Sequence, residues 1–240
     1  MRRSLLLVAI AAFAVSVYGQ AGRAGSPVLV ELFTSQGCSS CPPADKLLGE
    51  LAERPDVVAL AYHVDYWDYL GWKDTFAQPA FSERQRSYSS RVDRQYIKRR
   101  LRGSFTPEIV VQGSDSLIGS AAPIVTRRIE AHAAAPNLAE IVLRAEGGDL
   151  VVTLIRGSGA AMDTSVMLAR IRPRIDVTIE KGENAGRTIT YHNVVTDLSL
   201  AGRWNGKSDK TLIMAGVDGP AVVFLQSGTA GPVIAAAQTD

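Results

Sequence analysis

The chain has two cysteines, Cys38 and Cys41, and only two serines separate them. They lie between an apolar run over 28–33, which predicts a buried strand, and an amphipathic run over 42–53, which predicts a helix. Positions three apart on a helical turn are about 5–6 Å apart at Cβ, so a modest adjustment lets a disulfide open and close there. The spacing predicts a redox-active dithiol at a strand-to-helix junction.

Within this dithiol we expect Cys38 to be the nucleophile and Cys41 to be the resolving thiol. The unpaired N–H groups and the positive dipole end of a helix stabilise a thiolate and lower a cysteine pKa to roughly 3.5–7.5. Two alternatives stay open, because the same spacing occurs in metal sites. The cysteines could bind copper(I) as a pair of soft ligands, with His63 as a third ligand, or they could form a structural disulfide in a binding module.

Polar and aromatic residues follow the second predicted strand, at the end of the sheet where the cysteines also lie. His63, Asp65 and Asp68 could transfer a proton to a leaving thiol or ligate a soft metal. We favour the simpler interpretation that His63 ends the strand and the aspartates hold the following loop. Tyr66 and Trp67 in that loop are candidates for contact with a substrate protein. Alternatively, they are core residues that the second half of the chain covers.

The first residues read as a secretory signal over 1–24. Arg2 and Arg3 precede a nearly continuous apolar stretch that is too short to span a bilayer comfortably, and small residues follow it. The sequence therefore predicts a periplasmic or secreted protein, in a compartment where a disulfide persists.

Composition narrows the classes of partner. The 240 residues are 46% apolar and 21% charged, which is typical of a globular protein. The formal net charge of +2 falls to 0 without Arg2 and Arg3, so nothing indicates a nucleic-acid partner or a membrane partner after signal removal. The run over 84–102 carries eight Lys or Arg and one acid, but its apolar positions recur at helical spacing and predict a solvated helix face. No cofactor is expected.

The chain divides into two segments by pattern. Strand and helix signals alternate over 27–136, whereas 138–240 contains short alternating runs separated by turn residues, with no convincing helix. About eight strands in roughly 100 residues favour a β-sandwich or small barrel for the second segment. Its predicted strands are 140–145, 150–156, 165–172, 174–180, 188–197, 210–217, 221–226 and 232–237.

The first segment resembles the thioredoxin fold. Its elements follow the order strand, Cys-x-x-Cys helix, strand, helix, strand, hairpin strand, helix, and Thr106-Pro107 opens the third strand. The resemblance implies a cis bond before Pro107, facing the disulfide, and a backbone at Thr106 directed toward a bound peptide. It thus implies a catalytic set of Cys38, Cys41, Thr106 and Pro107.

A closer resemblance is to a family of secreted bacterial thioredoxin-like proteins of unknown function. The segments that carry it are 31–45, 63–72, 105–107 and 186–195, so it covers nearly the whole mature chain. It implies a fold and a compartment but no substrate. The residues between the cysteines are Ser39 and Ser40, not the Gly-Pro of thioredoxin, so a redox potential does not transfer.

These observations predict an α/β thioredoxin-like domain over 27–136, followed by an antiparallel β-rich, sandwich-like domain over 138–240. The predicted activity is thiol–disulfide exchange with protein thiols or disulfides of the cell envelope, in which Cys38 attacks and Cys41 resolves a mixed disulfide.

Overall fold

A computed structural model describes residues 26–89, 103–158 and 162–239. The predicted signal segment and most of the basic run lie outside these ranges. None of the described helices is long and apolar enough to cross a membrane. The described part contains the strands and helices β1 (Val28–Thr34), α1 (Pro42–Ala52), β2 (Val57–His63), the 3-10 helix η1 (Asp68–Leu70), α2 (Pro79–Tyr88), β3 (Glu108–Val111), β4 (Asp115–Ile118), α3 (Ala122–Ala133), β5 (Ala139–Glu146), β6 (Asp149–Arg156), β7 (Thr164–Thr178), β8 (Thr188–Trp204), β9 (Lys210–Met214), β10 (Ala221–Gln226) and β11 (Val233–Gln238).

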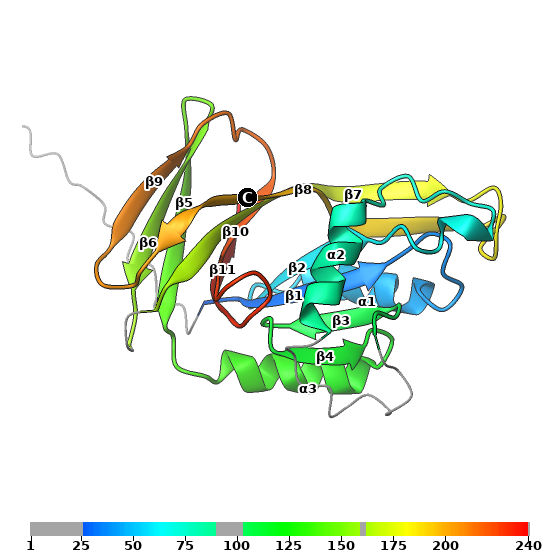
Figure 1. The fold of residues 1–240 in the computed structure, drawn as a ribbon, viewed down its shortest axis with the longest axis horizontal. Helices are drawn as coiled ribbons and strands as arrows, with labels where there is room; N and C mark the ends of the chain where they lie inside the picture. The colour runs from blue at the N-terminus through cyan, green and yellow to red at the C-terminus, as the bar shows by residue number, and fades with distance from the viewer. Residues whose placement is uncertain (1–25, 90–102, 159–161, 240) are drawn as a thin grey trace, which may run out of the picture.

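Eight of these strands form one mixed sheet, in the order β11-β10-β7-β8-β2-β1-β3-β4 (Figure 1). β1 and β2 are parallel, whereas β3 is antiparallel to β1 and β4 is antiparallel to β3. β8 joins β2 through a single parallel bridge between Ala61 and Val194, and β7, β10 and β11 continue the sheet as antiparallel strands. The sheet therefore combines strands from both halves of the chain.

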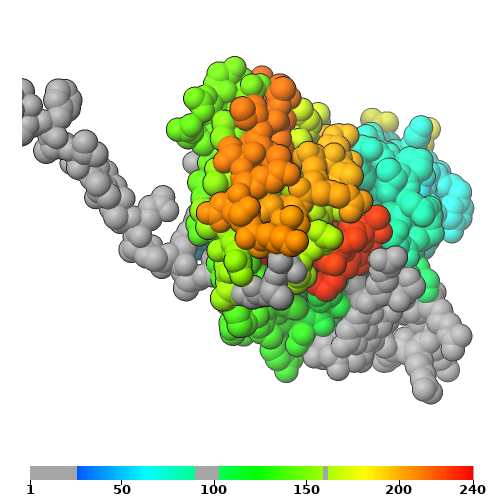
Figure 2. All heavy atoms as spheres, turned by 60° about the vertical axis from the view of Figure 1, so that its left-hand side comes forward, coloured from blue at the N-terminus to red at the C-terminus, as the bar shows by residue number. Residues whose placement is uncertain are grey.

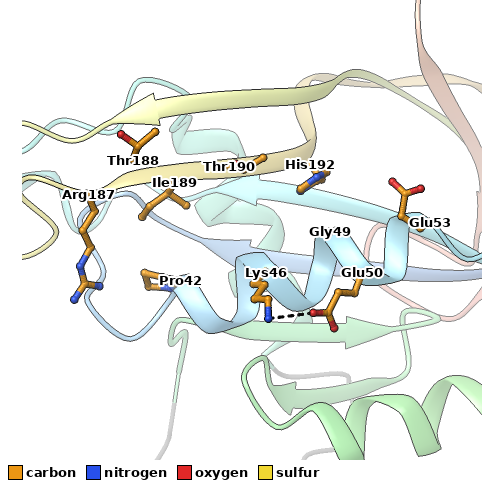
Figure 3. A pocket seen from close by; sticks show the side chains of 10 residues that line it. All are labelled: Pro42, Lys46, Gly49, Glu50, Glu53, Arg187, Thr188, Ile189, Thr190 and His192. Atoms are coloured by element: carbon orange, nitrogen blue, oxygen red, sulfur yellow. Dashed lines mark ion pairs between the residues drawn. The ribbon is translucent and has the colours of Figure 1, made fainter.

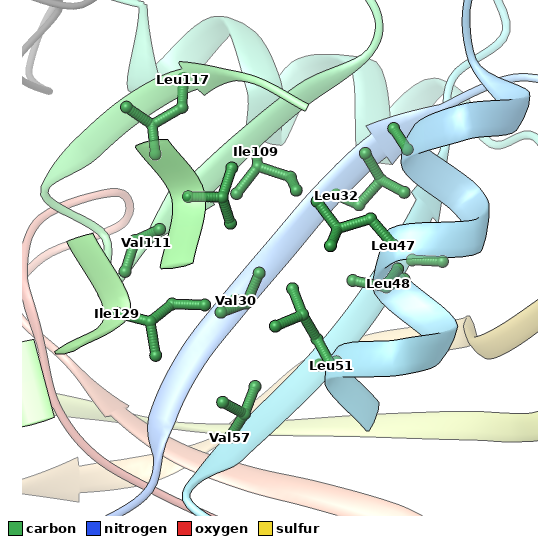
Figure 4. Packing of buried hydrophobic residues seen from close by; sticks show 14 of the residues in the cluster. Val30, Leu32, Leu47, Leu48, Leu51, Val57, Ile109, Val111, Leu117 and Ile129 are labelled. Carbon is green, nitrogen blue, oxygen red and sulfur yellow. The ribbon is translucent and has the colours of Figure 1, made fainter. Parts of the chain in front are cut away.

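The helices cover both faces of this sheet, so β1 is buried along its whole length. Val28, Val30 and Leu32 pack with α1 and α3, and the alternating Leu29 and Phe33 pack in the cluster that includes α2. A strand covered on both faces is nearly continuously apolar, as β1 is. Figure 4 shows the packing on the first face, with Leu47, Leu48 and Leu51 of α1 lying over β1.

A second sheet has three strands in the order β5-β6-β9. It packs against the part of the large sheet that β7, β10 and β11 form. Alternate residues of β6, such as Val152 and Leu154, are buried in a third cluster with residues of β7 and β10. Figure 2 shows this end, where β5 and β6 in green lie beside β9 in orange although they are far apart in sequence.

The predicted strands of the second segment are close to those observed, but two of them are much longer than predicted. β7 has 15 residues and unites the predicted runs 165–172 and 174–180, and β8 has 17 residues. Pro173 and Asn193 fall between the pairs Arg172↔Val194 and Arg174↔His192, and Asn193 has a positive φ of 45°. The ladder therefore continues past a local irregularity, and residues 174–192 extend the sheet as an arm (Figure 1).

The predicted fold class is wrong. A thioredoxin-like α/β domain followed by a separate sandwich requires the first sheet to end at β2, but β8 covers that edge and links it to β7, β10 and β11. β-sheet dominates the described chain, and only three α-helices cover it. Local signals located the strands but could not reveal that two long strands from the second segment would complete the sheet of the first. The boundary at 136–138 stays a prediction.

A buried ion pair fixes α2 to the sheet. The Arg84 side chain on α2 is 5% exposed, and its Nε donates to Glu31 Oε1 on β1 at 2.7 Å. Its Nη2 also donates to the hydroxyl of Tyr88 and to the Oε1 of Gln226 on β10. Arg84 is therefore an exception to the solvated face predicted for the basic run.

We expect Arg84→Met to lower the free energy of unfolding by about 3–5 kcal/mol, because it leaves Glu31 buried without its charge partner. Arg86→Met, two residues along α2, is the matched control, because Arg86 pairs with Glu83 at the surface and such pairs contribute at most about 1 kcal/mol. Urea unfolding of both variants tests this, and equal losses would contradict a dominant role for the buried pair.

Candidate functional site

Cys38 and Cys41 form a disulfide with a Cα–Cα distance of 5.4 Å. It lies just beyond the carboxyl end of β1 and directly before α1. Cys38 is 3% exposed and Cys41 is fully buried, whereas Ser39 and Ser40 are exposed. The Cys38 Sγ lies 3.4 Å from the Ser40 hydroxyl. Both cysteines are therefore buried in the disulfide form, and the roles expected for Cys38 and Cys41 stay a prediction.

The helix N-terminus differs from the sequence expectation. α1 begins at Pro42 with Cys41 as its N-cap, and Pro42 and Pro43 have no backbone N–H to offer. The next two N–H groups, from Ala44 and Asp45, both donate to the carbonyl of Cys41. The N–H groups of the first turn therefore cannot stabilise a Cys38 thiolate, and the local contributions left are the helix dipole and the Ser40 hydroxyl.

A residue far along the chain holds the loop before the disulfide. The buried Nδ2 of Asn184 donates to the carbonyl of Gln36 at 3.0 Å and to that of Cys38 at 2.9 Å. Asn184 lies between β7 and β8, at the tip of the arm. It is the donor to the Gln36 carbonyl and a second donor to the Cys38 carbonyl, which also accepts from the Cys41 N–H at 3.2 Å. The arm therefore helps to position the dithiol loop.

The bond between Thr106 and Pro107 is cis, as predicted. Pro107 is buried, and a methyl group built on Gly119 would lie 3.0 Å from the Pro107 Cβ and 3.2 Å from the Ala44 Cβ. The cis-proline and the first turn of α1 therefore meet around one glycine. The structure brings Thr106-Pro107 to the same end of the sheet as the disulfide helix.

Trp67 connects this proline loop to the dithiol loop. Its Nε1 donates to the Thr106 hydroxyl at 2.7 Å, and its Cβ and carbonyl oxygen lie 3.3 Å from where a Cβ on Gly37 would be. Tyr69 stacks on Trp67 and is 76% exposed. Tyr66 is half-buried and donates to the Gln85 side chain, and burial raises the Tyr66 pKa. Trp67 and Tyr69 are therefore the aromatic surface beside the disulfide.

Asp45 is a buried carboxyl on α1, four positions after Cys41 and therefore on the same face of the helix. Its Oδ1 accepts a hydrogen bond from the Thr34 hydroxyl at 2.7 Å, and its Oδ2 has no partner among the described residues. Burial raises the Asp45 pKa to about 7, with the Thr34 bond as a partial offset. This carboxyl can hold or release a proton near neutral pH.

His63 and Asp74 form a buried pair beside Asp45. The Asp74 Oδ2 accepts from His63 Nδ1 at 2.7 Å and from the Gln36 backbone N–H at 2.7 Å, while its Oδ1 accepts from the Phe76 N–H. Burial raises the pKa of Asp74, but His63 and the two backbone bonds outweigh burial and leave that pKa below its usual value. Because the ionised carboxylate only accepts, Nδ1 of His63 carries a proton.

The other predicted polar residues support the loop. The Asp65 carboxylate accepts from the Ser82 hydroxyl, and Asp68 Oδ1 accepts from the backbone of Asp74. His63 packs between the rings of Phe76 and Tyr191. Across the described ranges, no three His, Cys, Asp or Glu side chains are grouped to hold a metal ion. The copper(I) alternative gains no geometric support.

The sequence analysis did not identify three residues of the site. Asn184 lies in a turn among exposed residues, and nothing local marks it as a partner of Cys38. Asp74 lies in a loop and resembles any surface aspartate. Asp45 did carry a signal, because a carboxylate spaced four residues from Cys41, among the leucines of an amphipathic helix, falls on its buried face.

The fold and site define a class of protein: a mixed β-sheet protein with a Cys-x-x-Cys disulfide at a helix N-terminus, opposite a cis-proline. The chain belongs to the DUF1223 family, described as a protein of unknown function, which it matches over residues 29–226.

Two solved structures are similar. An X-ray crystal structure of a protein from Agrobacterium tumefaciens is 28% identical, with a TM-score of 0.75, over 90% of this chain and 95% of that chain. HBP35 of Porphyromonas gingivalis is 14% identical, with a TM-score of 0.55, over 91% of this chain and 76% of that chain, and this likeness concerns the fold alone. The search of curated proteins finds no match.

We expect Asn184→Ala to lower the free energy of unfolding by about 1–3 kcal/mol, because the Gln36 carbonyl loses its donor and the Cys38 carbonyl keeps only the Cys41 N–H. The backbone amides of residues 36–41 should also exchange hydrogen faster. Asn205→Ala is the control, because Asn205 is exposed and accepts only from a neighbouring backbone N–H. Chemical unfolding and mass-spectrometric hydrogen exchange measure both effects, and unchanged protection of 36–41 in the Asn184 variant would refute the clamp.

Asp45→Asn should change how stability depends on pH. The folded pKa of Asp45 is raised from 3.8 to about 7, so the folded state binds more protons across that window and wild-type stability falls as pH rises through it. The variant lacks this loss. Its free energy of unfolding should therefore rise relative to that of the wild type between pH 4 and pH 8, by up to about 4 kcal/mol.

Urea unfolding of the oxidised protein at a series of pH values measures this gain. Asp56→Asn is the control, because the hydrogen bond from Arg54 lowers the pKa of this surface carboxyl. Asp56 therefore titrates below this window, and its variant should differ from wild type by a constant amount between pH 4 and pH 8. A difference between wild type and Asp45→Asn that is constant with pH would show that Asp45 does not titrate in this range.

Proposed function

We propose that this protein is a thiol–disulfide exchange protein that acts through the Cys38–Cys41 couple. The observation that carries the proposal is the position of the disulfide: it joins the end of a buried strand to a helix, with a buried carboxyl that has a pKa of about 7 one turn further on. A disulfide that only braced the fold would need no ionisable group on the same helix face as its buried cysteine.

The exchange has two steps. In the first, a thiolate of the partner attacks the Cys38 sulfur, a mixed disulfide forms, and the Cys38–Cys41 bond breaks to release Cys41 as a thiolate. In the second, another partner thiolate attacks the partner's own sulfur in the mixed disulfide and releases the Cys38 thiolate. The partner gains a disulfide and the protein is reduced by two electrons; the reverse sequence oxidises the protein.

Asp45 would serve the proton balance of the buried thiol. Cys41 has no exposed surface, so its leaving thiolate needs a proton from within the protein. Protonated Asp45, on the same helix face, can supply it, and in the reverse direction the Asp45 carboxylate can take it back. A pKa near the working pH makes such transfer efficient in both directions, and the Asp45 pKa of about 7 meets this condition.

The compartment and the partners are part of the same proposal. The apolar N-terminal segment over 1–24 favours export, and an oxidising compartment keeps the disulfide formed. The partners would be protein thiols or disulfides of the cell envelope. The protein shares only local features with thioredoxin-like proteins, namely the dithiol helix and cis-Pro107, because its fold class differs.

Cys41→Ser tests the proposal most directly. Without the resolving thiol, a partner bound to Cys38 cannot be released internally, so the variant should accumulate a one-to-one mixed disulfide when incubated with oxidised glutathione. Intact-protein mass spectrometry measures the adduct. The rate should rise with pH through the Cys38 pKa, which we expect below the ordinary thiol value of about 8.5.

Cys38→Ser is the matched control, because it keeps one thiol of the same pair but leaves only the buried Cys41. It should form no adduct at a comparable rate. Adducts in neither variant, together with a loss of stability in both, would identify a structural disulfide and end the exchange proposal.

A further inference from the structure

A groove of about 670 Å³ lies between α1 and β8 (Figure 3). Pro42, the residue after Cys41, lies at one end of its α1 wall and Glu53 at the other. Residues 187–190 and His192 form the opposite wall. His192 packs directly on Gly49, where a Cβ would approach its ring to 2.7 Å. The groove therefore begins at the residue after Cys41 and follows the helix away from the disulfide.

The β8 wall is an open strand edge. Residues 188–192 pair with β7 on one side, and the one bridge between β8 and β2 lies beyond them, at Val194. On the α1 side, no described strand pairs with 188–192. An unpaired edge offers backbone N–H and C=O groups to an added strand, while neighbouring side chains form its specificity pockets.

The groove has the length of a short extended peptide. α1 has 11 residues, which at 1.5 Å per residue gives about 16 Å. Five residues of an extended chain span about the same distance, at 3.3–3.4 Å each. A peptide with its cysteine at the disulfide end would therefore contact the whole groove through the next five residues.

Charge is distributed unevenly along the groove. The exposed Arg187 lies near Pro42 at the disulfide end, and the exposed Glu53 lies at the far end (Figure 3). Between them Lys46 and Glu50 form an exposed ion pair of 3.5 Å, with Lys46 nearer the disulfide. The groove is thus basic near the disulfide and acidic away from it, and it complements a peptide of the opposite polarity.

We propose that this groove binds an extended segment of the protein that exchanges with Cys38. The segment adds to the β8 edge as a further strand. It has an acidic residue next to its cysteine and a basic residue about four positions from that acidic residue. It runs antiparallel to β8, the more stable pairing, so its cysteine is at the carboxyl end. This inference rests on the proposed exchange function and names the substrate class for it.

The probe is a fluorescein-labelled peptide, Lys-Thr-Val-Thr-Glu-Ser, in which serine replaces the reacting cysteine. It is titrated into the oxidised wild-type protein, so that no thiol chemistry contributes, and binding is followed by polarisation at low salt. A second peptide exchanges the Lys and Glu positions. Two exposed charge contacts of up to about 1 kcal/mol together predict an approximately fivefold preference for the first peptide.

Two controls separate backbone pairing from charge. N-methylation of alternate amides in the first peptide should weaken binding at least about tenfold, because it blocks the edge hydrogen bonds. The variant Lys46→Glu/Glu53→Lys should lose the preference between the peptides. Lys207→Glu/Glu146→Lys is the matched charge exchange at exposed sites outside the groove, and it should keep the preference.

The outcomes distinguish this inference from the exchange function. If glutathione reacts with Cys41→Ser but neither peptide binds, or N-methylation has no effect, the groove proposal is overturned and the exchange function stands. If the peptide binds as expected but glutathione forms no adduct, the exchange function fails and the groove proposal loses its substrate class. A dimer in sedimentation that the peptide does not dissociate would identify a second copy as the occupant and overturn the proposal.

Discussion

The hydrogen bonds from Asn184 to the carbonyls of Gln36 and Cys38 are the contact on which the site depends. The loop between β1 and α1 is buried up to Cys38, so its carbonyls need donors from inside the protein. The start of α1 supplies one donor, from the Cys41 N–H to the Cys38 carbonyl, but the two prolines that follow have no N–H. The remaining donor comes from the arm of β7 and β8, which must reach over the end of β2. The long strands, the continuous sheet and the dithiol loop therefore depend on one another.

Two buried aspartates near this loop differ in pKa because they differ in hydrogen bonds. Asp74 accepts from His63 and from the N–H groups of Gln36 and Phe76, and these bonds lower its pKa despite burial. Asp45 accepts from the Thr34 hydroxyl alone, so burial dominates and raises its pKa to about 7. The same desolvation thus gives one fixed charge and one exchangeable proton. Only Asp45 lies on the same helix face as Cys41.

The sequence predicted what local patterns determine. The alternation of apolar residues located β1, β2 and β10, the Cys38–Cys41 spacing predicted the disulfide, and Thr106-Pro107 is cis as expected. It could not predict partners that depend on strand pairing. Pro173 made β7 read as two runs, although the strand continues past it opposite the irregular Asn193. Without the long hairpin, neither the contact of β8 with β2 nor the position of Asn184 follows from the sequence.

The arm also connects the dithiol loop to the groove. Gly182 at its tip packs against the Trp72 side chain, Asn184 holds the loop, and His192 packs on Gly49 of α1. A side chain on Gly49 would displace the His192 ring, because a Cβ there would lie 2.7 Å from that ring. One hairpin therefore contacts both the loop of Cys38 and the helix wall of the groove. A change that moves β8 from α1 should thus disturb the disulfide loop as well as the groove wall.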